Sequence, residues 1–207
     1  MDEHGAAIRM ADPDRQSPIE YRADAWRGRL PAGDLEPVDD RFGGTINRPA
    51  LRAHARETDG GDAAARRRLL IAALLLGAGT TNRHYGNLER TLAAEHLNDV
   101  LGHSWEALAN GDLGQAYRTM ARMQGHGTGY PFFTKWLWAA GVATGAAPAP
   151  LIYDRNVRRA LRSLGWPGMQ RQRRDQRWQR YCDDAAHIVD ALDMSSEHAE
   201  LWLFQRA

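Results

Sequence analysis

The chain has 207 residues, of which 43% are hydrophobic and 26% are charged, and this composition is typical of one globular domain with a substantial core. Its single cysteine, Cys182, excludes intramolecular disulfides and four-cysteine zinc or iron–sulfur sites, and its eight histidines show no metal-ligand spacing. The net charge of +1 excludes a uniformly basic protein, and no apolar run approaches the roughly 20 residues of a membrane-spanning helix.

The first 45 residues contain several prolines and glycines and show no sustained hydrophobic period. We predict an irregular N-terminal arm over residues 1–45, with a short strand near the segment IEYRADAW. The opening residues, MDEHGAAIRMADPDR, are acidic and lack the apolar region of a signal peptide. We therefore expect a cytoplasmic location.

Residues 46–207 form a predicted helical domain, because capping residues and helix breakers separate successive apolar segments. No strand alternation or internal repeat follows residue 47, so the sequence predicts an all-α fold. The predicted helices cover residues 47–57, 62–77, 85–96, a short helix that begins at Ser104, and residues 112–124, 131–141, 154–165, 173–192 and 196–206.

Charge is distributed unevenly along the chain. Residues 1–45 hold ten acids and six arginines, whereas residues 155–180 hold nine arginines and a single acid, Asp175. So basic a stretch favours contact with DNA phosphates, and we assign Arg155 and Arg158 to that role. A solvated helix surface is the ordinary explanation of a charge run and is the alternative.

Lys135 lies in the segment PFFTKWLW and is the only lysine among the 27 Lys and Arg residues. A buried lysine can lose its proton and become a nucleophile, whereas an arginine stays charged. Pro131 favours the first turn of a helix, which places Lys135 near the positive end of the helix dipole and among aromatic neighbours. We therefore expect a lowered pKa for Lys135, and the alternative is a lysine without function in an arginine-rich chain.

Asp154 follows Lys135 by nineteen residues, in the segment PLIYDRNVRRAL. It is positioned to cap a helix, where its carboxylate accepts backbone N–H bonds and stays ionised. Taken alone, Asp154 is an ordinary helix cap. Paired with Lys135, it is a candidate catalytic carboxylate.

Two further segments complete a pattern, namely GAGTTNRHYGNLERTL, which begins at Gly77, and AELWLF, which ends at Phe204. In order and spacing, the four segments resemble the helix-hairpin-helix DNA glycosylases, in particular bacterial 8-oxoguanine DNA glycosylases. The resemblance spans about residues 70–206. It implies a two-lobed helical fold that flips a modified base out of double-stranded DNA and excises it, with Lys135 and Asp154 as the catalytic residues.

The resemblance also assigns roles to other residues. Asn82, Arg83 and His84 would fill the gap that the extruded nucleotide leaves. Glu200 and Phe204 would line the base pocket, and Trp138 and Ala139, one turn after Lys135, would face the same pocket. The family hairpin reads Gly-x-Gly-x-Lys, but here Pro131 and Phe133 occupy the glycine positions, so we assign the hairpin contact with DNA to Gly127 and Gly129.

The favoured function is therefore a DNA glycosylase with AP-lyase activity, in which Lys135 forms a Schiff base with the sugar. An ionised Glu200 suits the adjacent N1–H and N2–H₂ donors of 8-oxoguanine, and the alternative for Glu200 is a surface ion pair. Lys135 could instead only position a water that Asp154 activates, in a monofunctional enzyme. We expect a monomer that binds no cofactor, metal or membrane.

Three other functions are compatible with the same sequence. The first is a glycosylase that excises a hypermodified phage base, such as glucosylated hydroxymethylcytosine, in antiviral defence rather than base excision repair. The second is a helix-hairpin-helix module that binds DNA without catalysis. The third is a helical protein-interaction domain, for which the arginine run has no role.

Overall fold

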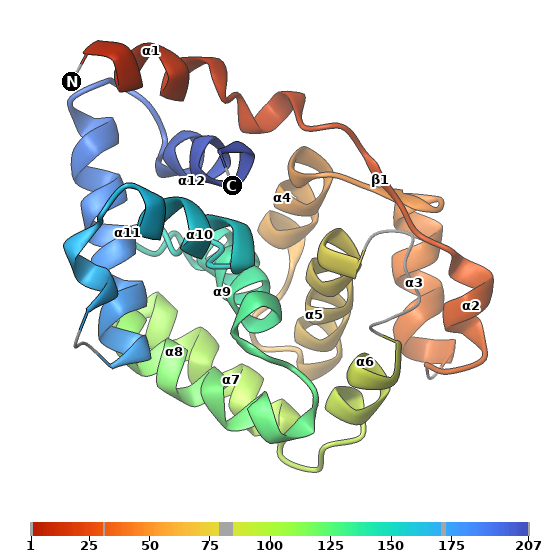
Figure 1. Ribbon diagram of the computed structural model, residues 1–207. Coiled ribbons are helices and arrows are strands. Elements are labelled where there is room, and N and C mark those ends of the chain that lie inside the picture. Colours follow the sequence, from red (N-terminus) through yellow and green to blue (C-terminus); the bar gives the residue numbers. More distant parts are fainter. Residues whose placement is uncertain (1, 31, 79–84, 171–172, 207) are drawn as a thin grey trace.

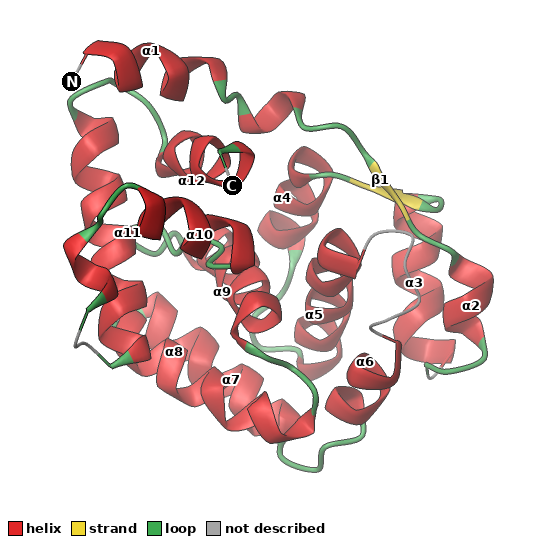
Figure 2. Ribbon diagram, viewed as in Figure 1, coloured by secondary structure: helices red, strands yellow, loops and turns green. Residues whose placement is uncertain are grey.

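The computed structural model describes residues 2–30, 32–78, 85–170 and 173–206 (Figure 1). These residues form twelve α-helices, short 3-10 helices and one two-stranded sheet, so the predicted all-α fold class is confirmed (Figure 2). The three residues predicted to fill the gap in DNA, Asn82, Arg83 and His84, lie outside the described residues.

The N-terminal region is ordered into regular elements, so the predicted irregular arm is wrong in this respect. Of the predicted strand near IEYRADAW, only Ile19 and Glu20 pair as a strand, because the chain becomes helical at Ala23. The elements are α1 (Asp2–Met10), η1 (Pro13–Arg15), β1 (Ile19–Glu20), α2 (Ala23–Arg27), α3 (Ala32–Phe42) and β2 (Thr45–Ile46), and β1 pairs antiparallel with β2.

Helix α3 shows why the prolines misled the prediction. Pro37 lies inside this helix, where proline normally interrupts the hydrogen-bonding pattern. Leu35, Val38 and Phe42 nevertheless recur at helical spacing, and all three are buried. Because α3 packs against α5, burial of this apolar face outweighs the local cost of the proline.

The helices after residue 46 follow the predicted order. Asn47 caps the first of them by accepting a hydrogen bond from the Ala50 N–H at 2.9 Å. The elements are α4 (Arg48–Glu57), α5 (Ala63–Ala78), α6 (Tyr85–Leu92), α7 (Leu97–Ala109), α8 (Leu113–Ala121), η3 (Arg122–His126), α9 (Tyr130–Thr144), α10 (Arg155–Ser163), η4 (Pro167–Met169), α11 (Arg174–Asp190) and α12 (Ser196–Gln205).

Ser104 is the exception, because it does not begin a helix. It lies within α7, is fully buried, and donates its hydroxyl to the backbone oxygen of Val100 at 2.7 Å. A serine that bonds back to its own helix in this way needs no cap position. The residues on both sides of Ser104 therefore form one helix instead of a helix that starts there.

Helix α9 lies at the centre of the molecule and packs against α4, α5, α7 and α8 (Figure 1). Its residues from Phe133 to Gly141 are all buried, as are residues 69–76 of α5, which packs between α3 and α9. A helix covered on several sides needs apolar residues around its whole circumference. None of the described helices combines the length and hydropathy needed to cross a bilayer.

A hairpin formed by α8, η3 and α9 carries Lys135 on its second long helix. The turn before α9 requires glycine at position 127, where φ is +97°. A Cβ atom there would also lie 2.7 Å from the backbone oxygen of Asn87 in α6. Helix α6 therefore supports the hairpin through a contact that leaves no space for a side chain.

Helix α12 brings the C-terminal segment back against the N-terminal helix α1. It packs against α1, α10 and α11 (Figure 1). Its buried residues include Ala199, Glu200, Leu201 and Leu203, and Glu200 is only 1% exposed. A fully buried glutamate on an otherwise apolar face requires a compensating partner.

Candidate active site

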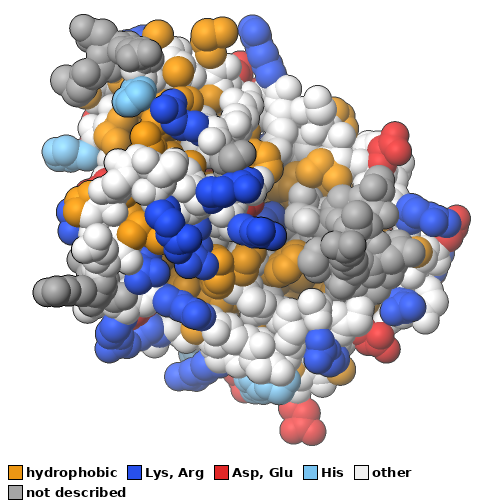
Figure 3. All heavy atoms as spheres, in the orientation of Figure 1, with side chains coloured by type: hydrophobic (Ala, Val, Ile, Leu, Met, Phe, Trp, Pro, Cys, Tyr) orange, Lys and Arg blue, Asp and Glu red, His pale blue; other side chains and the backbone are white. Residues whose placement is uncertain are grey.

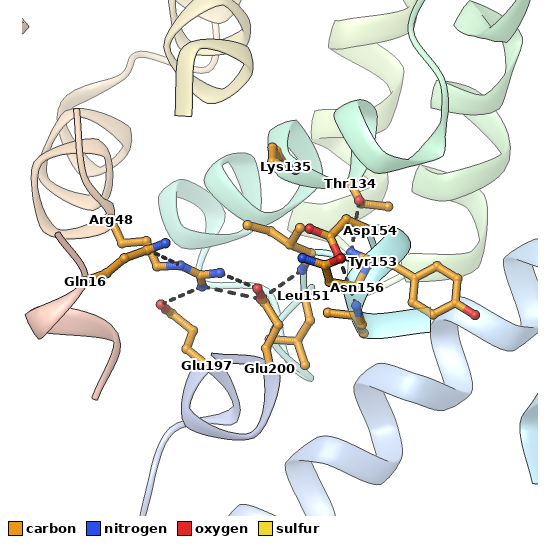
Figure 4. Close-up of polar contacts among 12 residues, drawn as sticks. Gln16, Arg48, Thr134, Lys135, Leu151, Tyr153, Asp154, Asn156, Glu197 and Glu200 are labelled. Carbon is orange, nitrogen blue, oxygen red and sulfur yellow. Dashed lines mark hydrogen bonds and ion pairs between the residues drawn. The ribbon is translucent and has the colours of Figure 1, made fainter. Parts of the chain in front are cut away.

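A cavity of about 230 Å³ opens where the N-terminal region, α4, α5, α9 and α12 meet. It is lined by Gln16, Ile19, Arg48, Leu76, Gly77, Lys135, Ile152, Asp154, Glu200 and Phe204. The structure thus brings four predicted site residues, Lys135, Asp154, Glu200 and Phe204, from segments far apart in the sequence to the border of one cavity. Figure 4 shows Lys135, Asp154 and Glu200.

Lys135 reaches this cavity from the second turn of α9 and is 9% exposed. Its Nζ atom donates a hydrogen bond to the backbone oxygen of Pro131 at 2.9 Å. Its alkyl chain crosses α5 at Gly77, where an added Cβ atom would lie 2.6 Å from Cε and 2.7 Å from Cδ of the lysine. The absence of a side chain at position 77 therefore provides the space that the lysine occupies.

The pKa of the Lys135 amine is lowered, mainly because burial disfavours its charged form. The negative charges of Asp154 and Glu200 oppose this shift, and the positive charge of Arg48 adds to it. The direction agrees with the prediction from the sequence. An amine with a lowered pKa is uncharged, and hence nucleophilic, over a wider pH range.

Asp154 is held by a short extended connector whose backbone groups are anchored one by one. The Trp178 indole N–H donates to the Leu151 oxygen at 2.8 Å, the Ile152 N–H donates to Glu200 Oε2 at 3.0 Å, and the Tyr153 N–H donates to Thr134 Oγ1 at 3.1 Å. These bonds come from α11, α12 and α9. They fix the connector directly before Asp154.

The Asp154 carboxylate caps α10, as the sequence predicted. Its Oδ1 atom accepts hydrogen bonds from the backbone N–H groups of Asn156 at 2.9 Å and Val157 at 3.0 Å. One oxygen is thus used to hold the side chain in place. Because Asp154 borders the same cavity as Lys135, its charge can act on a group bound there.

Glu200 pairs with Arg48 of α4, and both side chains are buried (Figure 4). Its Oε1 atom accepts from Arg48 Nη2, and Oε2 accepts from Arg48 Nη1 at 3.4 Å. Burial raises the pKa of the Glu200 carboxyl, while Arg48 and the Ile152 N–H oppose that shift. The ion pair that was the alternative for Glu200 therefore exists, but inside the cavity wall and not on the surface.

Phe204 is 37% exposed and borders the cavity, so part of its ring is accessible. The other two predicted pocket residues lie elsewhere. The Arg48 guanidinium lies over the Trp138 ring, with its Cζ atom 5.4 Å from the ring centroid. Trp138 borders a second cavity, and Ala139 is fully buried. Neither residue is among the described residues that line the cavity of Lys135, although the sequence led us to expect Trp138 and Ala139 beside Glu200 and Phe204.

Of the residues assigned to DNA contact, two glycines lie in the hairpin and two arginines lie in α10. Gly127 forms the turn of the hairpin, Gly129 caps α9, and Arg155 is exposed at the first position of α10. Arg158 instead lies over the Tyr130 ring, 5.2 Å from its centroid, and its Nη1 donates to the phenol oxygen. Figure 3 shows many basic and few acidic side chains on the face that carries α10 and α11.

Sequence reasoning missed Gln16, Arg48 and Gly77 as cavity residues. Arg48 could have been found, because it precedes the buried residues Leu51 and Ala55 at helical spacing and so places a charge on an apolar face. The role of Gly77 could not have been found from the sequence, because the lysine that it makes room for comes from a different helix. The described residues contain no group of three or more potential metal ligands.

Residues 12–204 match the model of the family described as "Putative 8-oxoguanine DNA glycosylase OGG-like protein". The chain belongs to this family. Searches of curated proteins and of solved structures gave no match. Membership in the OGG-like family indicates a DNA glycosylase with DNA as its substrate, as the sequence predicted. The family match also covers Gln16 and Arg48, so the N-terminal wall of the cavity is part of the OGG-like domain.

The Thr134 hydroxyl links the lysine helix of this OGG-like chain to the connector before Asp154, and Thr134→Val removes that link. The buried Tyr153 N–H would lose its acceptor, so we expect the free energy of unfolding to fall by about 1–3 kcal/mol. Thr134→Ser retains the hydroxyl and should cost less. Urea denaturation measures both changes.

Thr144→Val is the matched control, because among the described residues the Thr144 hydroxyl bonds only within its own helix, to the backbone oxygens of Ala140 and Gly141. An equal loss of stability at positions 134 and 144 would contradict the role of Thr134 as the link to the connector.

Proposed function

We propose that this DNA glycosylase excises an oxidised guanine, with 8-oxoguanine as the preferred base, and then cleaves the DNA strand through a Schiff base on Lys135. The observation that carries the proposal is that a buried amine of lowered pKa and a fixed carboxylate border one cavity. The family description supports the base, and the accessible ring of Phe204 offers a surface on which a base can stack.

Extrusion of the nucleotide must come first, because the reacting bond is inaccessible inside a duplex. The basic surface around α10 and α11 would hold the phosphates during this step. As the bond between C1′ and the base breaks, positive charge develops on the sugar. The Asp154 carboxylate, held in place by two backbone N–H groups, would stabilise that charge.

The uncharged Nζ atom of Lys135 would attack C1′ while the base leaves with the bonding electron pair. The amine gives up one proton, which neutralises the departing base. The C1′–O4′ bond then breaks, O4′ takes a proton from water, and the nitrogen lone pair forms the protonated Schiff base with C1′. Loss of a proton from C2′ then expels the 3′ phosphate by β-elimination. Water hydrolyses the Schiff base, which releases the unsaturated aldehyde of the sugar and regenerates the lysine.

The decisive test is borohydride reduction during incubation with a duplex that contains one 8-oxoguanine, because reduction makes a Schiff base permanent. We expect a covalent protein–DNA adduct with the parent and none with Lys135→Ala. Asp154→Asn preserves the helix cap but removes the charge, so base release should slow by about two orders of magnitude or more while DNA binding persists. An adduct formed by Lys135→Ala would reject the lysine as the nucleophile.

A monofunctional enzyme would release the base without forming any adduct. Base release without an adduct would therefore keep the glycosylase and remove the AP-lyase step. A duplex panel with uracil, alkylated purine and glucosylated hydroxymethylcytosine, run beside 8-oxoguanine, tests the preferred base in the same experiment.

The lowered pKa of Lys135 predicts the pH dependence of adduct formation on DNA with a preformed abasic site. Only the uncharged amine attacks, so the rate should rise with pH and level off below the ordinary lysine pKa of about 10.4. Asp154→Asn removes a charge that raises this pKa, so the rising part of the profile should move to lower pH. A profile that rises only near the ordinary lysine value would contradict a desolvated amine.

Gly77→Ala should displace Lys135 and leave the fold largely intact, because the added methyl group meets the flexible end of a side chain and not backbone. We expect adduct formation on abasic DNA to fall by about tenfold or more, since a misplacement of about 1 Å can reduce a rate a hundredfold. Gly102→Ala is the matched control within a helix, because its methyl group would make only an ordinary contact with Arg66. Equal rates for the two variants would show that Gly77 does not position the lysine.

A further inference from the structure

Gln16 lies between η1 and β1 and is one of the residues that line the cavity of Lys135. Its Oε1 atom accepts a hydrogen bond from Arg48 Nε at 3.0 Å (Figure 4). An arginine side chain has five N–H donors and no acceptor, so Gln16 can meet it only with its carbonyl oxygen. This contact fixes which end of the amide is which.

Arg48 is itself held in place by other residues. It pairs with Glu200 and, at 3.6 Å, with Glu197, and it lies over the Trp138 ring. A guanidinium that is fixed on three sides cannot turn to release the amide oxygen. The Nε2 donor of Gln16 is therefore the end that stays available, and it has no hydrogen-bond partner among the residues that the structure describes.

The other polar side chains that line the cavity already have hydrogen-bond partners or a role in the proposed reaction. Glu200 accepts from Arg48 with both oxygens and from Ile152, which leaves it less able to read the N–H groups of a base than the sequence suggested. In the proposed function, Lys135 and Asp154 act on the sugar. The polar group left to read the base is consequently a donor.

We propose that Gln16, oriented by Arg48, is a specificity-determining residue that donates its amide N–H to a carbonyl oxygen of the extruded base. The substrate class is a base that presents such an oxygen toward the N-terminal wall, and 8-oxoguanine carries two, O6 and O8. This inference rests on the proposed function because it assumes that the base occupies the cavity beside Lys135.

Two substitutions isolate the donor. Gln16→Glu keeps an oxygen for Arg48 but has no N–H to give, and Gln16→Met keeps the length of the side chain without charge or donor. With a duplex that contains 8-oxoguanine, we expect both variants to excise the base about tenfold more slowly, which is the upper range for one hydrogen bond.

A duplex with a preformed abasic site distinguishes base reading from a structural role, because this DNA has no base to read. We expect borohydride adducts on abasic DNA to form at close to the parent rate with Gln16→Met, since Lys135 and Asp154 are unchanged. A loss of both activities would show that Gln16 only supports the fold, and would overturn the inference.

Excision of 8-oxoguanine at the parent rate by either variant would also overturn the inference while leaving the proposed function intact. A parent protein that forms adducts on abasic DNA but leaves 8-oxoguanine in place would instead reject the proposed substrate, and this role of Gln16 would fall with it. The two failures therefore give different results in the same pair of assays.

Discussion

The geometry of the cavity depends on the connector from Leu151 to Tyr153, whose backbone is bonded in turn to α11, α12 and α9. Each of these bonds satisfies a buried polar group that would otherwise cost about 1–3 kcal/mol. Together they determine where α10 begins and hence where its capping residue, Asp154, is placed. The hydrogen bond from the Tyr153 N–H to the Thr134 hydroxyl fixes the position of the Asp154 carboxylate relative to α9, the helix that carries Lys135.

Burial has the largest effect on the pKa of Lys135 and lowers it. The nearby charges act in opposite directions on the same pKa, because the carboxylates raise it and Arg48 lowers it. Arg48 and Glu200 are paired with each other, so their charges largely cancel at the lysine, and Asp154 is the nearby carboxylate without an arginine among the partners described here. The charge of Asp154 raises the pKa of the lysine, and burial lowers it by more. The cavity therefore combines a buried amine of lowered pKa with a carboxylate that two backbone N–H groups hold in place.

The sequence alone predicts much of this arrangement, because helix caps are local signals. Asn47, Asp112 and Asp154 each cap the helix that their positions predicted. What it cannot predict is the result of contacts between distant segments. The residues near Trp138 in the sequence do not indicate that Arg48 covers the Trp138 ring. In α3, the proline at position 37 argues against a helix, although the helix forms and buries one face.

The sequence pattern did not predict the helices of the N-terminal region, and this region also forms one wall of the cavity through Gln16 and Ile19. Burial of Trp26, Leu35 and Val38 anchors this region to the core, and β1 pairs with β2 directly before α4. That pairing holds the chain between η1 and β1 close to Arg48, which begins the next helix. A lone arginine in the cavity wall would be an uncompensated buried charge, which is strongly destabilising. The partners of Arg48, Glu200 of α12 and Gln16 of the N-terminal region, therefore connect the two ends of the chain through a single side chain at the cavity.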